Sequence, residues 1–182
     1  MLRQRDEPVA CRRGSYPRLA AARVKWQYVT RIYYPSVNLM KFKVSYDAQT
    51  SDGIKALWEL PADATVLDIT PMGDVFLELQ DGEFVMVSVT DGEVMTVTEE
   101  IKEYGLPPVD VALGDDWYHL DAQAALSEAG MTLYANECFG FNTPLFKDGD
   151  YSAENLDVIN ILEYHKRVRD LLVAAKKRFT NL

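Results

Sequence analysis

Alternating hydrophobic and polar positions dominate the chain between residues 65 and 97. Three runs rich in β-branched residues show the period of two that is typical of half-buried strands: 65–70, 74–79 and 83–89. Asp81-Gly82 and Asp91-Gly92 lie at the junctions that follow the second and third runs, and Asp-Gly supplies the positive φ values of a tight hairpin turn. The pattern predicts a three- or four-stranded antiparallel meander that ends near Val97.

Hydrophobic positions with helical spacing lie on both sides of this segment. Before it, Ile54, Leu57 and Trp58 predict a short helix over residues 53–60. After it, residues 99–104 predict a helix of one turn or more, because Gly and Pro residues follow them and stop a helix.

The next part of the chain predicts a helix and two strands. Residues 122–129 have strong helix propensity, and Asp121 is the expected N-cap because its carboxylate can accept from the first free backbone N–H groups. Residues 137–141 and 156–161 are predicted to be short strands on either side of a loop over 142–155.

The chain closes with a predicted amphipathic helix over residues 163–179. Its apolar side chains form one stripe, and its basic side chains largely avoid that stripe. Together the elements predict an α+β fold: an antiparallel meander sheet packed against two or three helices, with a C-terminal amphipathic helix. The strands and helices do not alternate as they do in a nucleotide-binding sheet.

Residues 1–39 have a different character. They lack a sustained period and carry eight Arg or Lys residues against two acidic ones. We interpret them as a basic, poorly ordered tail ahead of a single domain over residues 40–182. Met40 is a second candidate for the true start of the protein, and a genuine basic arm or an organelle-targeting segment is the alternative.

The charge is unevenly distributed. The whole chain has a formal net charge of −9, yet the stretch from Val44 to His165 holds 25 carboxylates and only three basic side chains, a net charge of −22. Such a field repels nucleic-acid phosphates and attracts basic surfaces. Direct DNA or RNA binding is therefore disfavoured, and a basic protein partner is favoured.

Composition places the chain among soluble proteins. No run approaches the roughly 18 apolar residues of a membrane span. Two cysteines are too few for a disulfide framework, and they indicate a reducing compartment. A soluble, cytoplasmic protein that does not bind a membrane is the expectation.

The usual signatures of catalysis are missing from the sequence. There is no phosphate-binding Gly-x-x-x-x-Gly-Lys loop, no Gly-x-Ser-x-Gly elbow and no His-Glu-x-x-His pair. His119 and His165 are interpreted as structural, and Cys138, beside Phe139, as a small buried hydrophobic residue. We therefore expect no enzymatic activity, no catalytic residue, no metal site and no cofactor.

Two segments carry a resemblance to a known family. The first is Gly73-Asp74-Val75-Phe76-Leu77-Glu78 with the Asp-Gly turn that follows it. The second runs from Glu137-Cys138-Phe139-Gly140-Phe141-Asn142-Thr143-Pro144 through Gly149-Asp150-Tyr151 to Glu154-Asn155-Leu156-Asp157-Val158. Over roughly residues 65–175 the chain resembles the C-terminal domain of type VI secretion DNase-immunity proteins. It departs from that pattern at Phe139, where tyrosine is common, and at Lys147-Asp148-Gly149, which replaces a Leu-Gly-Gly run.

The resemblance implies an immunity protein that binds a cognate toxin, with a nuclease as the expected kind, and blocks its basic surface. It brings no catalytic residue with it. The carboxylates at the predicted turns are the candidates for the acidic binding surface: Asp81, Glu83, Asp91, Glu93, Asp115, Asp116, Asp148 and Asp150. The alternative is a non-enzymatic regulatory or scaffolding module that binds a housekeeping partner or a small ligand. The oligomeric state is left open.

Overall fold

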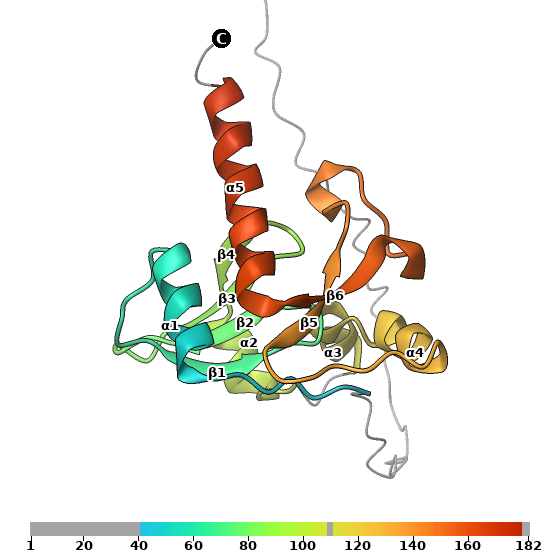
Figure 1. Ribbon diagram of the computed structural model, residues 1–182. Helices are drawn as coiled ribbons and strands as arrows, with labels where there is room; N and C mark the ends of the chain where they lie inside the picture. The colour runs from blue at the N-terminus through green and yellow to red at the C-terminus, as the bar shows by residue number, and fades with distance from the viewer. Residues whose placement is uncertain (1–40, 109–110, 180–182) are drawn as a thin grey trace, which may run out of the picture. The chain divides into compact units, whose positions relative to one another are not determined.

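The computed structural model describes residues 41–108 and 111–179, which form an α+β domain as the sequence predicts (Figure 1). The predictions made for residues 1–39 fall outside these described residues. No helix within the two ranges is both long enough and apolar enough to cross a membrane.

Four antiparallel strands form the meander sheet, in the order of the chain. They are β1 (Thr65–Ile69), β2 (Val75–Glu78), β3 (Phe84–Ser88) and β4 (Glu93–Thr96). At the two predicted hairpin turns, Gly82 and Gly92 have φ values of 80° and 76°. The predicted meander is confirmed, with four strands.

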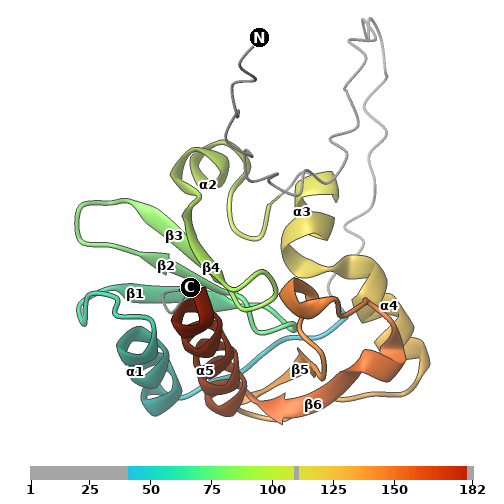
Figure 2. The ribbon, with the colours of Figure 1, turned by 90° about the horizontal axis from the view of Figure 1, so that it is seen from above.

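The first face of the sheet packs against two helices, α1 (Ala48–Leu57) and α5 (Ile161–Phe179). Val75 and Leu77 of β2 point to this face, and they share a core with Ile54 of α1 and Val168 of α5. Figure 2 shows α1 and α5 side by side on this face. The C-terminal amphipathic helix therefore has the role that its apolar stripe predicts.

The second face packs against α2 (Thr98–Tyr104) and α3 (Val111–Tyr118), which lie on the other side of the sheet in Figure 2. Phe76, between Val75 and Leu77 in β2, points to this face because successive strand side chains alternate. Its ring lies 5.0 Å from that of Trp117. Both faces of the sheet are thus covered.

A second, two-stranded antiparallel sheet stands beside the meander. It pairs β5 (Glu137–Phe141) with β6 (Leu156–Asn160) and shares a small core with α4 (Leu120–Glu128) and Met72. The loop over 142–155 joins its strands through two short 3₁₀ helices, η1 (Leu145–Lys147) and η2 (Ala153–Asn155). The predicted strands on either side of this loop are confirmed.

Helices α1 and α5 begin earlier than predicted because a side chain caps each of them. Helix α1 starts at Ala48 because the Asp47 carboxylate accepts from the Thr50 backbone N–H at 2.8 Å, which satisfies one of the free donors of the first turn. In the same way, the Asn160 side chain accepts from the backbone N–H groups of Leu162 and Glu163 ahead of α5.

The prediction that Asp121 caps a helix is wrong. Helix α3, which was not predicted, ends at Tyr118, and the chain turns at His119 in a left-handed conformation, with φ 50° and ψ 55°. Helix α4 then begins at Leu120, so Asp121 lies inside its first turn. The early start of α4 follows from this tight junction between two consecutive helices.

Candidate functional site

The carboxylates proposed from the sequence lie in several segments of the fold. Asp81 and Glu83 lie at the β2–β3 turn, whereas Asp91 and Glu93 lie at the β3–β4 turn. In an antiparallel meander these turns are at opposite ends of β3, which spans about 14 Å. The two hairpin ends are therefore separated along the sheet, and their joint contribution to one acidic surface stays a prediction.

The β3–β4 turn is instead joined to the 142–155 loop. A Cβ atom on Gly92 would lie 3.3 Å from the ring of Phe146, so the turn packs directly against η1. Asp148 and Asp150 follow η1 in this loop. We call the exposed carboxylates of Asp91, Glu93, Asp148 and Asp150 the acidic end of the domain.

The 142–155 loop is held in one conformation by Asn155. Its side chain accepts from the Thr143 backbone N–H at 2.7 Å and donates to the carbonyl groups of Thr143 and Asp150 at 2.9 and 2.8 Å. Gly149 lies against the Thr143 carbonyl, where a Cβ atom would have no room. These contacts order the loop in advance, which lowers the entropy that a partner must remove on binding.

Each loop carboxylate is positioned by local contacts. Asp148 lies in the left-handed region with φ 64°. Asp150 accepts from the backbone N–H and the hydroxyl of Ser152, and these hydrogen bonds hold the pKa of its carboxyl below the ordinary value. Tyr151, the next residue, is 46% exposed, and its ring lies 5.5 Å from the ring of Phe141.

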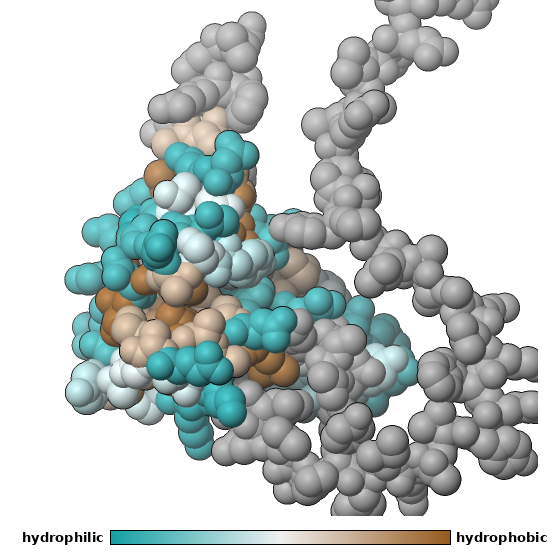
Figure 3. Space-filling model, turned by 90° about the vertical axis from the view of Figure 1, so that its right-hand side faces the viewer, coloured by the Kyte–Doolittle hydropathy of each residue, from teal (hydrophilic) through white to brown (hydrophobic). Residues whose placement is uncertain are grey.

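The acidic pair predicted at residues 115 and 116 lies in α3. Asp116 is exposed, and the side chain of Asp115 is outside the described part of the chain. Figure 3 shows the side of the domain on which α4 and the 142–155 loop lie in Figure 1; hydrophilic side chains there are interspersed with hydrophobic ones.

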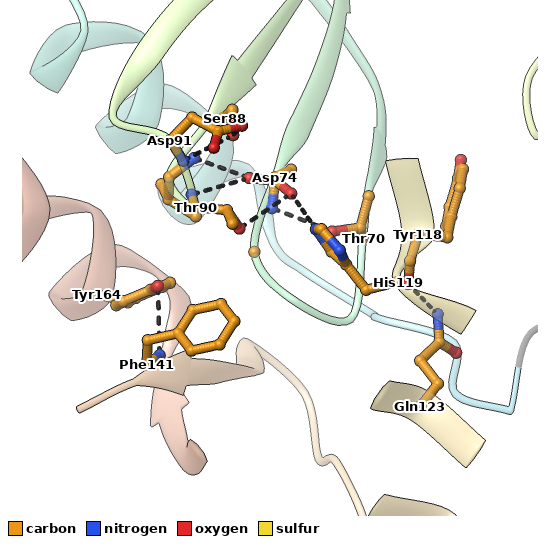
Figure 4. Close-up of polar contacts among 12 residues, drawn as sticks. Thr70, Asp74, Ser88, Thr90, Asp91, Tyr118, His119, Gln123, Phe141 and Tyr164 are labelled. Atoms are coloured by element: carbon orange, nitrogen blue, oxygen red, sulfur yellow. Dashed lines mark hydrogen bonds and ion pairs between the residues drawn. The ribbon is translucent and has the colours of Figure 1, made fainter. Parts of the chain in front are cut away.

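A buried carboxylate that sequence analysis did not single out stands behind the acidic end. Asp74, at the start of β2, is 2% exposed and accepts from the backbone N–H groups of Val89 and Thr90 at 2.8 and 3.3 Å. Its second oxygen accepts from the Thr90 hydroxyl at 3.4 Å (Figure 4). Asp74 therefore fixes the strand end that leads into the β3–β4 turn. Its place in the Gly73-Asp74 dipeptide was noted only as part of the resemblance.

His119 is the ionisable side chain nearest to this carboxylate in Figure 4. Its Nε2 atom lies 3.5 Å from Oδ2 of Asp74, and its side chain is 14% exposed. On another side, the imidazole ring lies 5.5 Å from the ring of Tyr151. The interpretation of His119 as a partly buried residue is confirmed, and its link to Asp74 is the finding that spacing along the chain did not indicate.

His165 is fully buried and joins α5 to two other elements. Its Nδ1 atom accepts from the Trp58 indole N–H at 2.8 Å, so the ring proton is on Nε2, which donates to the Gly73 carbonyl at 2.9 Å. Burial lowers the pKa of His165 to about 4, although the Gly73 carbonyl acts in the opposite direction. The predicted structural role is confirmed.

This buried histidine predicts a loss of stability in mild acid. Because its folded pKa lies below the ordinary 6.5, its contribution to stability is complete above pH 6.5 and is lost as the pH falls towards 4. The difference corresponds to about 3 kcal/mol. Urea unfolding of the wild type and of His165→Gln between about pH 7 and pH 5 measures it. The free energy of unfolding should fall more steeply with decreasing pH in the wild type than in the variant. Equal pH dependence would contradict the role assigned to His165.

Cys138 is inert as a nucleophile. It is fully buried, and desolvation raises the pKa of its thiol, with the Asp74 and Glu137 carboxylates adding to that effect. The thiol stays protonated and packs in the main core. The predicted role of Cys138 as a small buried hydrophobic residue is confirmed.

The described residues form a groove and a smaller hollow. A groove of about 680 Å³ runs between residues 41–44 and the outer edge of β1, where the Tyr118 hydroxyl donates to Asp68 at 2.7 Å. A smaller polar hollow of about 370 Å³ lies in the 142–155 loop. Neither hollow is lined by His119 or Cys138. Within the described ranges, no three His, Cys, Asp or Glu side chains are grouped to hold a metal ion.

No protein-family model fits the chain, and no curated protein is significantly similar to it.

Proposed function

We propose that this protein is an immunity-type inhibitor that binds a basic toxin, a nuclease in the favoured case, and covers the surface with which the toxin contacts its substrate. The single observation that carries the proposal is the net charge of −22 between Val44 and His165. A nuclease must present a basic groove to phosphates, and an acidic domain is drawn to the same groove. The resemblance described above supports the same conclusion.

The acidic end is the surface that we assign to this contact. Its carboxylates are exposed, and the loop that carries two of them is ordered by Asn155 before any partner arrives. Preorganised charges give fast, oriented association, whereas buried aromatic anchors give most of the affinity. Tyr151, which is partly exposed beside Asp150, is the aromatic anchor that we propose.

The experiment starts with the partner. The full-length chain is immobilised, and a lysate of the source organism is passed over it at about 50 mM and about 500 mM salt, because exposed charges are screened at the higher concentration. The proposal requires a basic protein that is retained only at the lower concentration and whose cleavage of DNA is blocked by the chain. Recovery of a protein with no toxic activity would favour the regulatory or scaffolding alternative.

Removing carboxylate charges separately at the two ends of β3 then shows which end contacts the partner. The double variant Glu93→Gln/Asp148→Asn removes two charges from the acidic end and preserves the backbone at residue 148, since Asn tolerates the left-handed conformation. We expect association with the recovered partner to slow by about tenfold at low salt.

The matched control removes two charges from the opposite end. Asp81→Asn/Glu83→Gln keeps the side-chain oxygens that accept from the Glu83 backbone N–H and from the Thr96 hydroxyl. Its association rate should change by no more than about twofold. Equal slowing by the two double variants would show that the contact is not confined to the acidic end.

A further inference from the structure

Asp74 and His119 connect the buried interior to both parts of the acidic end. On one side, Asp74 accepts hydrogen bonds from the backbone N–H groups of Val89 and Thr90. These two residues immediately precede the turn that carries Asp91 and Glu93. From the other side, the His119 ring lies against Tyr151 of the loop that carries Asp148 and Asp150. The contact between His119 and Asp74 therefore joins the two segments through the interior.

The backbone sets the position of His119 independently of this contact. His119 occupies the junction between α3 and α4 in a left-handed conformation, and both neighbouring residues are the ends of helices. Helix α3 is held by the packing of Trp117 and Tyr118 against Phe76 of the sheet. Helices α3 and α4 therefore place the imidazole next to the Asp74 carboxylate, whatever the charge of the ring.

The Asp74 carboxylate is 2% exposed, so its contacts replace the water that it would have on the surface. A buried carboxylate is stabilised by hydrogen bonds and by an opposite charge. Two backbone N–H groups and a hydroxyl supply the hydrogen bonds. Protonated His119 supplies the opposite charge, and the neutral ring does not.

Histidine is the side chain whose ordinary pKa falls between pH 5 and 8, and the side chain of His119 is 14% exposed beside this carboxylate. Among the described residues, the other ionisable groups around the pair include Cys138, Tyr164, His165, Arg167, Tyr151, Asp91 and, through its bond to Tyr118, Asp68. Arg167 is a cation at every pH in this range, so the charge of His119 adds to that of Arg167. Burial raises the pKa of the Cys138 thiol and of the Tyr164 phenol, and it lowers the pKa of His165 to about 4. These three groups are therefore neutral throughout that range.

We propose that protonation of His119 regulates the acidic end. The protonated ring links Asp74, and with it the β3–β4 turn, to the 142–155 loop. Loss of the proton weakens this link. The proposal rests on the proposed function in that the acidic end is the partner-binding surface. A tighter, preorganised surface binds more strongly, so partner affinity should rise as the pH falls from about 8 to about 6.

The test uses the free full-length chain and NMR, with no partner present. In the wild type, the amide signals of Val89 and Thr90 should titrate with the same midpoint as the His119 ring. After correction for intrinsic rates, their hydrogen exchange should be about fivefold to tenfold slower at about pH 6 than at about pH 8. Amides that do not follow the His119 ring would overturn the proposal without the need for a variant.

Two variants test the two contacts of His119 separately, one with Asp74 and one with Tyr151. His119→Asn removes the titrating group while tolerating the left-handed backbone, so the exchange of Val89 and Thr90 should lose its pH dependence. Tyr151→Ala keeps the pair with Asp74 and removes the contact with the loop, so exchange in 142–155 should become faster while the pH dependence at Val89 remains. Unchanged pH dependence in His119→Asn would contradict the proposal.

Failure of this proposal is distinguishable from failure of the proposed function. If the Val89 and Thr90 amide signals titrate with the His119 ring but no basic toxin is bound, the link through His119 exists and the immunity function fails. If a toxin is bound in a salt-dependent manner and the amides do not follow His119, the function stands and the regulation fails.

Discussion

Replacement of Asp74 by Ala is expected to lower the free energy of unfolding by about 3 kcal/mol, because it removes the acceptor of several buried donors at once. The backbone N–H groups of Val89 and Thr90, both of which are buried, would lose their partner. The His119 ring would lose its carboxylate as well. Urea unfolding at neutral pH, followed by circular dichroism, measures the change.

The matched variant for this experiment is Asp74→Asn. The amide keeps one oxygen, which can accept from the Val89 and Thr90 N–H groups, but its nitrogen cannot accept from the Thr90 hydroxyl or pair with His119. We expect it to lose about half as much stability as Asp74→Ala. A loss below about 1 kcal/mol in the Ala variant would show that Asp74 does not organise this region.

Gly149→Ala is expected to lower stability by about 3 kcal/mol, or to unfold the 142–155 loop locally, because a Cβ atom has no space. It would overlap the Thr143 carbonyl oxygen and lie 2.8 Å from the carbonyl carbon and 2.9 Å from the Pro144 oxygen. These are backbone atoms, so no side-chain rotation can relieve the overlap. Thermal unfolding reports the global loss, and limited proteolysis within 142–155 reports the local one.

Gly114→Ala is the matched control. A Cβ atom there would lie no closer than 3.9 Å to its neighbours, in ordinary contact, and Gly114 is inside helix α3. Since Ala favours a helix over Gly, this variant should be more stable than the wild type by about 0.5–1 kcal/mol. If both variants destabilise the protein equally, crowding at Gly149 is not the cause.

The features that sequence predicted best are those set by neighbouring residues. The alternation in residues 74–79 places Val75 and Leu77 on one face and Phe76 on the other, and the structure has this arrangement. Gly82 and Gly92 adopt the positive φ values that their Asp-Gly turns require. Short-range periodicity and turn chemistry therefore predict the meander without any knowledge of the rest of the fold.

Helix α3 was missed for a local reason as well. Gly114 and the two following aspartates lower its intrinsic helix propensity, so residues 111–118 do not stand out in the sequence. The helix is stabilised by tertiary packing, above all by Trp117 and Tyr118 against Phe76. Its presence then moved the start of the next helix away from Asp121.

The candidate site needed three-dimensional information. Sequence identified the exposed carboxylates, but only the sheet topology separates Asp81 and Glu83 from Asp91 and Glu93. The pairing of Asp74 with His119 joins residues that are 45 positions apart, and no spacing rule predicts it. Gly140 has a packing role that the sequence motif does not indicate, since a Cβ atom there would lie 2.6 Å from the side chain of Ile159.

The central claim is that this protein acts by binding a basic toxin. The most direct measurement is to express each gene that neighbours this one singly in a bacterial host, with and without the full-length chain. The account predicts that one neighbour alone degrades DNA and stops growth, that the chain restores growth, and that Glu93→Gln/Asp148→Asn restores it less well than Asp81→Asn/Glu83→Gln. Absence of any toxic neighbour, or toxicity that the wild-type chain does not relieve, would contradict the account.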